Sequence, residues 1–260
     1  MRVLASYNVK GGVGKTTTVV NLAHRAAVSG SRTLVFDLDP QGAASYYLRA
    51  NPKVRRTGKA LIRAKHDVAD AVVPTDYPHL DLVPADFSFR NVDVVLDATK
   101  DPSDRLRRLV RPLAGHYDYV FFDCPPSISR LSESVFGAAD ALLIPLIPTT
   151  LSVRSLEQLR DFFGCSGGRP RRKPPGPVPL LLPFFSMVDR RKRLHRELIE
   201  ELSAVPFGIL ATVVPSASAV ERMGPHQAPV AAFAPRAAPA KAYATMWSEI
   251  VTRLGAAPEA

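Results

Sequence analysis

One short stretch near the start of the chain concentrates glycine, lysine and threonine: Lys10-Gly11-Gly12-Val13-Gly14-Lys15-Thr16-Thr17. It directly follows an apolar run. Glycines let a backbone curl so that several N–H groups point at one anion. A lysine at position 15 suits the β- and γ-phosphates of a nucleotide, and a hydroxyl at position 16 suits Mg²⁺. These residue types and spacings predict a phosphate-binding loop whose contacts are Gly11, Gly12, Val13, Gly14, Lys15, Thr16 and Thr17.

Carboxylates follow two further apolar runs. Asp37 and Asp39 leave residues 33–37 at alternate positions, so both are expected to project to one side. Asp123 ends a second run in the form of a Walker B motif, whose carboxylate orders Mg²⁺, usually through water. An aspartate at a strand end often only caps a turn. Three motifs in this order favour a nucleotide site at the carboxyl ends of the strands, with Thr16, Asp37 and Asp123 serving the metal.

Short apolar runs alternate with amphipathic stretches, a pattern typical of parallel βαβ units. The expected strands are 3–7, 33–37, 119–123, 141–146, 180–185 and 208–214, with 80–84 as a weaker candidate. The expected helices are 15–28, 104–113, 128–136, 152–163, 190–204 and 238–254. The predicted fold class is α/β, a P-loop NTPase-like, mostly parallel twisted sheet with helices on both faces, in three layers.

Composition indicates a globular protein. The chain has 260 residues, of which 46% are hydrophobic and 22% charged, which suits a single domain over 1–260. Gly164–Pro179 is dense in glycine, proline and arginine and is expected to be an exposed, flexible loop. Cys124 and Cys165 form no metal-type pair, and the histidines show no metal-ligand spacing. No signal peptide or membrane-spanning run is evident, so a cytoplasmic protein is expected.

The motifs resemble those of the ParA/MinD family of deviant Walker A ATPases, and most of all those of the small ParA-type partition ATPases. The matching residues are Lys-Gly-Gly-Val-Gly-Lys-Thr-Thr at 10–17, Asp-Leu-Asp-Pro-Gln-Gly at 37–42 and Asp-Cys-Pro-Pro at 123–126. The ordinary phosphate loop has glycine five residues before Gly14, whereas this chain has Val9 there, followed by Lys10. The resemblance covers nearly the whole chain.

The resemblance implies a set of roles. Lys15 binds the nucleotide of its own subunit, and Lys10 is the signature lysine that reaches the nucleotide of the partner in a face-to-face homodimer. Asp39 matches the residue that positions the attacking water, which makes Lys10, Lys15 and Asp39 the expected catalytic set. Pro215 lies where the adenine-contacting loop is expected. The implied ligands are ATP or ADP and Mg²⁺, with slow hydrolysis that a ParB-like or cargo-adaptor partner stimulates.

A basic segment provides a second candidate surface. Arg190, Arg191, Lys192, Arg193 and Arg196 open a predicted helix whose buried face is marked by Leu194, Leu198 and Leu202. Cations are unfavourable in a first helical turn, whereas a phosphate backbone attracts them. The alternative is a solvated face neutralised by nearby glutamates. The net charge of +10 is compatible with either a polyanion partner or an Arg-rich soluble protein. Arg222 is a further candidate contact, and His195 is expected to face solvent.

Three functions are compatible with these observations. The first is an ATP-dependent positioning ATPase whose homodimer binds nucleoid DNA non-specifically and moves a plasmid, a chromosome or an organelle such as a carboxysome. The second is a MinD-like membrane-associated ATPase, against which the absence of a basic amphipathic C-terminus argues. The third is a metabolic enzyme on the same fold, for which no substrate motif is evident. We favour the first, with no membrane partner and a nucleoid-associated location.

Overall fold

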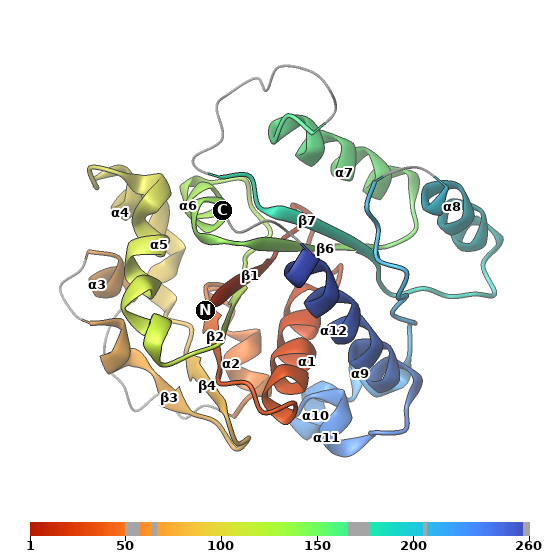
Figure 1. The fold of residues 1–260 in the computed structure, drawn as a ribbon, viewed down its shortest axis with the longest axis horizontal. Helices are drawn as coiled ribbons and strands as arrows, with labels where there is room; N and C mark the ends of the chain where they lie inside the picture. Colours follow the sequence, from red (N-terminus) through yellow and green to blue (C-terminus); the bar gives the residue numbers. More distant parts are fainter. Residues whose placement is uncertain (50–57, 64–66, 166–176, 205–206, 257–260) are drawn as a thin grey trace.

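The computed structural model describes residues 1–49, 58–63, 67–165, 177–204 and 207–256. At the centre of the described part lies a seven-stranded sheet in the order β3-β4-β2-β5-β1-β6-β7 (Figure 1). Neighbouring strands run parallel, except that β3 is antiparallel to β4. The strands are β1 Arg2–Ser6, β2 Thr33–Asp37, β3 Val73–Pro74, β4 Leu80–Val83, β5 Tyr119–Asp123, β6 Ala141–Leu146 and β7 Leu180–Phe185.

The α-helices of the described part are α1 Lys15–Val28, α2 Ala43–Tyr47, α3 Gly58–Ile62, α4 Val92–Asp97, α5 Arg105–Val110, α6 Arg130–Ala138, α7 Thr150–Phe162, α8 Arg193–Ser203, α9 Ser218–Glu221, α10 Met223–His226, α11 Val230–Phe233 and α12 Ala238–Ala256. Short 3₁₀ turns are η1 Val68–Ala71, η2 Phe87–Asn91, η3 Pro102–Asp104 and η4 Arg111–Gly115. None of the described helices is long and apolar enough to cross a bilayer.

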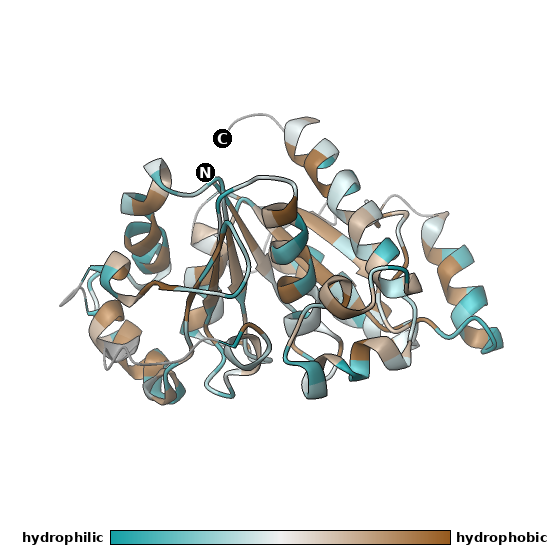
Figure 2. Cartoon of the chain, turned by 90° about the horizontal axis from the view of Figure 1, so that it is seen from below, coloured by the Kyte–Doolittle hydropathy of each residue, from teal (hydrophilic) through white to brown (hydrophobic). Residues whose placement is uncertain are grey.

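The central strands are apolar because both of their faces are covered, which gives the expected three layers. Val3 and Ala5 of β1 pack with residues of α3 to α8 on one face. Leu4, between them, packs with α1 and α12 on the other face. Successive side chains of a strand point to opposite faces, so one short run supplies both cores. Figure 2 shows the brown strands between helices whose outer sides carry teal.

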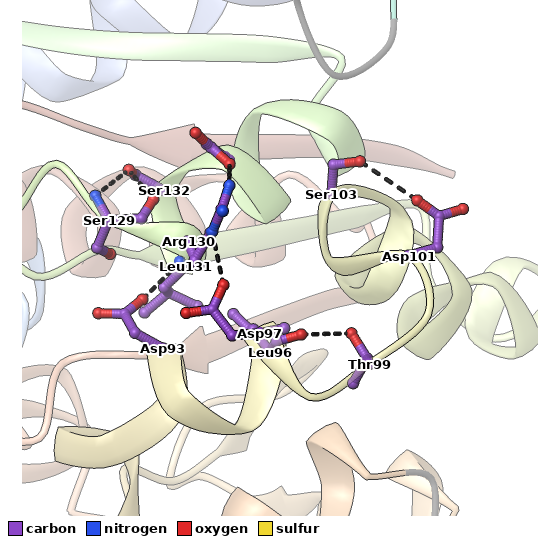
Figure 3. Close-up of polar contacts among 11 residues, drawn as sticks. Asp93, Leu96, Asp97, Thr99, Asp101, Ser103, Ser129, Arg130, Leu131 and Ser132 are labelled. Carbon is purple, nitrogen blue, oxygen red and sulfur yellow. Dashed lines mark hydrogen bonds and ion pairs between the residues drawn. The ribbon is translucent and has the colours of Figure 1, made fainter.

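The loop after β5 is anchored by α4 (Figure 3). The Asp93 carboxylate accepts a hydrogen bond from the Leu131 N–H at 2.9 Å, and Arg130 contacts Asp97 at 2.7 Å. Ser129 caps α6 reciprocally with Ser132. These contacts satisfy the free N–H groups at the start of α6. They also hold the segment between Asp123 and α6, which forms part of the site described below.

Most of the expected elements are confirmed, including α1 with identical bounds and β4, the weaker strand candidate. The expected helix 104–113 is instead η3, α5 and η4, because Pro112 lacks the N–H that a continuous α-helix needs. The basic helix begins at Arg193 rather than at residue 190. Residues 166–176 of the expected flexible loop lie outside the described residues.

The expected strand at 208–214 is wrong. Its backbone runs beside β7, since Leu210 N–H donates to Pro183 O and Val214 N–H to Phe185 O, at 2.8 and 2.9 Å. Between these bonds, the N–H groups of Ala211 and Thr212 donate to the Glu249 carboxylate of α12 at 2.7 and 3.1 Å. A carboxylate on another element takes these two donors, so no regular ladder forms.

Candidate nucleotide site and neighbouring basic turn

The glycine-rich segment forms a tight loop between β1 and α1. Gly12 and Gly14 have φ angles of +71° and +94°, a left-handed backbone region that favours glycine. A Cβ atom on Gly14 would also lie 3.0 Å from Ser186 Oγ. The loop ends at Lys15, the first residue of α1, so the free N–H groups and the positive end of the helix dipole face the loop. This geometry suits an anion.

A pocket of 320 Å³ lies against this loop, within the size range of small-ligand sites. It is lined by Gly11, Gly12, Gly14, Lys15, Thr16, Thr17, Asp39, Ala43, Tyr47, Pro126, Ser186, Met187, Val214, Pro215, Ser216, Ala217, Val220, Glu221 and Tyr243. Of the predicted site residues, the loop glycines, Lys15, the threonines, Asp39 and Pro215 therefore come together. Val13 is buried behind the loop, and Lys10 does not line this pocket.

Lys15 is buried, with 7% of its surface exposed. Its ammonium donates to the Lys10 carbonyl at 2.9 Å. Burial lowers the pKa of Lys15, while the negative charge of Asp123 works in the opposite direction. Lys15 is thus a buried cation held against the loop, and it lines the pocket.

Asp37 and Asp39 differ in their surroundings, although they are two residues apart. Asp37 is fully buried, and its carboxylate accepts hydrogen bonds from the Ser45 hydroxyl, the Ser45 N–H and the Asp39 N–H at 2.7, 2.8 and 3.2 Å. Burial nevertheless raises the pKa of Asp37 to about 6. Asp39 lines the pocket, and one of its oxygens accepts from the Gln41 N–H at 2.9 Å. Asp39 is therefore the carboxylate that a ligand meets directly.

Asp123 lies beside Asp37 across the sheet and is fully buried. Neither of its carboxylate oxygens has a hydrogen-bond partner among the described residues, although the nearby Thr16 hydroxyl lowers its pKa. Burial first, and the charge of Asp37 second, raise the pKa of Asp123 well above its usual range. A buried carboxylate without a partner is unfavourable unless a cation compensates it. The Thr16–Asp123 pair therefore fits a divalent cation.

The far wall of the pocket contains residues that sequence reasoning missed. Met187 follows β7 with a φ of +55°, a left-handed conformation rare for such a side chain. Tyr243 comes from α12, and burial raises its pKa. Val188 bridges to Pro215, which joins the strand-β7 side of the pocket to the 214–217 segment. No local pattern indicates these residues, because each reaches the pocket through the packing of a distant element.

The basic residues lie on an exposed turn next to this wall. A second cavity, of 550 Å³, is lined by Arg190 and Arg191, and Pro215 and Ser216 line both this cavity and the nucleotide pocket. Arg191 pairs with the Asp189 carboxylate at 2.9 Å, which lowers the pKa of Asp189 to about 2. Arg193 pairs with Glu197 at 2.6 Å. Local carboxylates thus partly neutralise the predicted cluster.

Other members of the cluster carry less local compensation. Arg190 and Lys192 are exposed, and no ion pair joins either to a described carboxylate. Arg196 donates to the Arg190 carbonyl at 2.9 Å. Arg222 lies between α9 and α10, where it contacts the His226 ring at 3.0 Å. Arg222 therefore belongs to a different element from the turn.

Two side chains of α8 differ from expectation. His195 is buried rather than solvent-facing, because its Nδ1 accepts a hydrogen bond from the Asp189 N–H at 3.1 Å. Leu194 is 50% exposed, so the buried face of the helix consists of His195, Leu198 and Leu202. His195, Leu198 and Leu202 are spaced by three and four residues, which places all three on one face of the helix.

Comparisons with known proteins agree with this geometry. A family model described as an AAA domain matches residues 1–165. The chromosome partitioning protein ParA of Caulobacter vibrioides is 35% identical over 260 residues, which cover 97% of this chain and 95% of ParA. The sporulation initiation inhibitor protein Soj of Bacillus subtilis is 29% identical, covering 96% of this chain and 98% of Soj.

A solved structure with a similar fold is the cobyrinic acid a,c-diamide synthase of Mycobacterium smegmatis with bound ATP analogue and magnesium. Its TM-score is 0.82 at 25% identity, covering 98% of this chain and 96% of the synthase. The sequence identity with ParA, 35%, is higher than the identity with the synthase and extends over nearly the full length of both proteins. The Lys10–Lys15 loop points to the same family. The chain belongs to the ParA family of deviant Walker A ATPases.

Proposed function

We propose that this chain is a partition or positioning ATPase that alternates between a nucleotide-dependent homodimer on DNA and a released form. ATP closes the dimer, the dimer binds nucleoid DNA without sequence preference, and hydrolysis releases it. A ParB-like or cargo-adaptor partner stimulates the weak intrinsic hydrolysis, in the cytoplasm, on the nucleoid. The observation that carries the proposal is the pocket in which the phosphate loop, Thr16 and Asp39 converge, with the buried Asp123 next to Thr16.

The loop residues and the three aspartates each have a role in this proposal. Lys15 holds the β- and γ-phosphates, and the loop N–H groups hold the remaining phosphate oxygens. Thr16 ligates Mg²⁺, and Asp123 orders its water shell, which compensates a carboxylate that otherwise has no partner. Asp37, whose Oδ2 already accepts two hydrogen bonds from Ser45, supports the metal shell. Asp39 orients the attacking water at the open side of the pocket.

The proposed homodimer is supported by apolar side chains beside the loop. Val9, Ile128 and Leu151 follow the carboxyl ends of β1, β5 and β6 and are 42%, 79% and 62% exposed. Large apolar residues exposed together around a polar site are typical of a protein interface. Lys10 lies next to Val9 and would supply a cation to the triphosphate of the partner. Because two subunits would share the phosphate charge, dimerisation would require ATP.

DNA binding is proposed for Arg190, Arg191, Lys192, Arg193 and Arg196, with Arg222 as an outlying contact. The turn shares a wall with the nucleotide pocket, so a ligand that reshapes residues 214–217 also acts on the turn. The cations most available to phosphates are Arg190, Lys192 and Arg196, since Asp189 and Glu197 engage the other two.

A filter-binding titration tests the DNA step. The triple variant Arg190→Ala, Lys192→Ala, Arg196→Ala should bind DNA more weakly with every sequence, and its log Kd against log salt should have a slope smaller by about 2–3. The control variant Lys100→Ala, Arg111→Ala, Arg253→Ala removes the same charge from exposed sites elsewhere. Equal salt slopes for the two variants would exclude the turn as the DNA surface and leave only a general charge effect.

The synthase similarity gives a second candidate, an ATP-dependent ligase on the same fold. ATP hydrolysis that rises with DNA and a partner protein, and does not respond to an added corrinoid acid with an amide donor, supports the partition ATPase. The opposite response would support the ligase. Flotation with anionic liposomes tests the MinD-like alternative, which requires ATP-dependent membrane binding.

A further inference from the structure

The turn that leaves β1 is built around a buried asparagine. Asn8 is 4% exposed and uses both ends of its side-chain amide. Its Nδ2 donates to the Pro145 carbonyl in β6 at 2.8 Å, and its Oδ1 accepts from the Lys10 N–H at 3.0 Å. Asn8 therefore ties the start of the phosphate loop to the neighbouring strand.

The Asn8 side chain replaces a backbone hydrogen bond between the end of β1 and β6. Tyr7 N–H donates to Leu143 O at 3.0 Å, the last backbone bond from β1 to β6. In a regular parallel pair the next acceptor on β6, Pro145 O, would receive the N–H of Val9. The amide of Asn8 occupies that acceptor instead. The backbone can thus leave the sheet at Asn8 without leaving a buried carbonyl unpaired.

Lys10 is consequently held on both sides of its own backbone. Its N–H bonds to Asn8, and its carbonyl accepts from the Lys15 ammonium at 2.9 Å. The Lys10 side chain is half-buried, and its ammonium makes no hydrogen bond or ion pair to any residue that the structure describes. Which rotamers a side chain adopts depends on its backbone angles. Fixing the Lys10 backbone therefore restricts the χ1 rotamers from which its side chain starts and narrows the region that its ammonium reaches.

We propose that Asn8 is a positioning residue that aims Lys10 at the triphosphate bound by a second copy of this chain. The inference rests on the proposed function, in which Lys10 acts across the dimer. A long lysine side chain on a free loop would lose more conformational freedom when it binds the partner nucleotide. The two hydrogen bonds that hold the Lys10 backbone remove part of that entropic cost before the subunits meet. Asn8 does not line the nucleotide pocket, so its effect is expected in dimer affinity and not in nucleotide affinity.

The test compares Asn8→Ala with a matched buried asparagine. Asn21 is 3% exposed and donates a hydrogen bond to Thr17 O at 2.7 Å. Its Oδ1 accepts from the Val230 N–H at 2.8 Å, and this second bond links α1 to α11. Asn21 also donates to Met223 Sδ at 3.3 Å, so Asn21→Ala removes one hydrogen bond more than Asn8→Ala does, without touching Lys10. Dimer dissociation is measured by analytical ultracentrifugation with AMPPNP and Mg²⁺, AMPPNP affinity by calorimetry, and folding by thermal unfolding.

Asn8→Ala is expected to weaken the AMPPNP dimer by about tenfold or more, the equivalent of one or two lost hydrogen bonds. The AMPPNP affinity per protomer and the unfolding temperature of Asn8→Ala should match those of Asn21→Ala. The dimer dissociation constant of Asn21→Ala should stay within about threefold of the wild-type value, a change in free energy smaller than that of one hydrogen bond. Asn8→Ser keeps a weaker acceptor for the Lys10 N–H and should lie between Asn8→Ala and the wild type. If Asn8→Ala does not fold, Asn8→Ser carries the same comparison.

Two results would overturn the inference: unchanged dimerisation of the Asn8 variants, or equal losses in the Asn8 and Asn21 variants. Lys10→Ala separates these from a failure of the proposed function. If Lys10→Ala abolishes the dimer while the Asn8 variants keep it, only the positioning role of Asn8 is wrong. If Lys10→Ala dimerises like the wild type, the shared-triphosphate dimer itself is wrong.

Discussion

Replacing Asp123 with asparagine should stabilise the ligand-free protein while abolishing its response to Mg²⁺ and ATP. Both carboxylate oxygens are buried, and the one hydroxyl that favours their charge is that of Thr16, to which an asparagine oxygen can also accept, so Asp123→Asn removes a charge and can keep that contact. Burial and Asp37 hold the pKa of Asp123 well above its usual range, which means that ionisation destabilises the fold.

The magnitude follows from the same pair of carboxylates. A pKa of about 6 for Asp37, against an ordinary 3.8, corresponds to about 3 kcal/mol against ionisation in the folded state. Burial is the first cause of that shift, and Asp123 is buried as completely as Asp37 and also feels the charge of Asp37, so removing the Asp123 charge should recover about 1–3 kcal/mol at pH 8. For a chain of this length each kcal/mol shifts Tm by about 2–4 °C, so Asp123→Asn should unfold about 2–12 °C higher.

The pH dependence has a definite sign. When the pKa of an acid is higher in the folded than in the unfolded state, the folded state binds more protons between the two values, and stability falls as pH rises. The wild type should therefore lose stability from about pH 4 through the folded pKa of Asp37, about 6. Asp123→Asn should show a smaller loss over this range.

Thermal unfolding followed by circular dichroism, with and without Mg²⁺-ATP, provides the measurement. Asp118→Asn is the control, because Asp118 precedes the same strand but pairs with Arg32 at 3.0 Å, which lowers its pKa. That variant should be slightly less stable and should keep its response to Mg²⁺-ATP. An Asp123→Asn protein that unfolds below the wild type at pH 8 without ligand would show that the carboxylate is compensated, and the magnesium assignment would lose its basis.

Three further results are expected. Lys15→Ala should lose the thermal stabilisation by Mg²⁺-ATP, since its ammonium is the cation buried in the loop, and an unchanged ATP affinity by calorimetry would refute that role. Asp39→Ala should bind ATP and remain dimeric in light scattering while its phosphate release slows, because Asp39 faces the pocket and makes one local hydrogen bond. Asp189→Asn should bind DNA more tightly at low salt, because the bidentate pair that holds Arg191 is weakened; equal or weaker binding would contradict competition between Asp189 and phosphate.

The sequence alone determined the phosphate loop and the positions of most strands along the chain. Gly12 and Gly14 stand where the backbone is left-handed, and apolar runs stand where strands are covered on both faces. These features depend on local backbone preference and on short-range periodicity, which a linear pattern records directly. The Lys10–Thr17 spacing predicted the loop for the same reason.

Only the tertiary structure decided which distant groups meet. The Glu249 carboxylate accepts hydrogen bonds from two N–H groups of 208–214, so that segment does not form a strand. The Asp189 N–H donates to the His195 ring, which is buried. Met187 and Tyr243 reach the pocket from elements that no local motif connects with the loop. A hydrogen bond or an ion pair forms when two groups come within about 3 Å of each other, whatever their separation in sequence. Sequence periodicity therefore indicates which residues are buried, but the packing of elements determines the partners they find there.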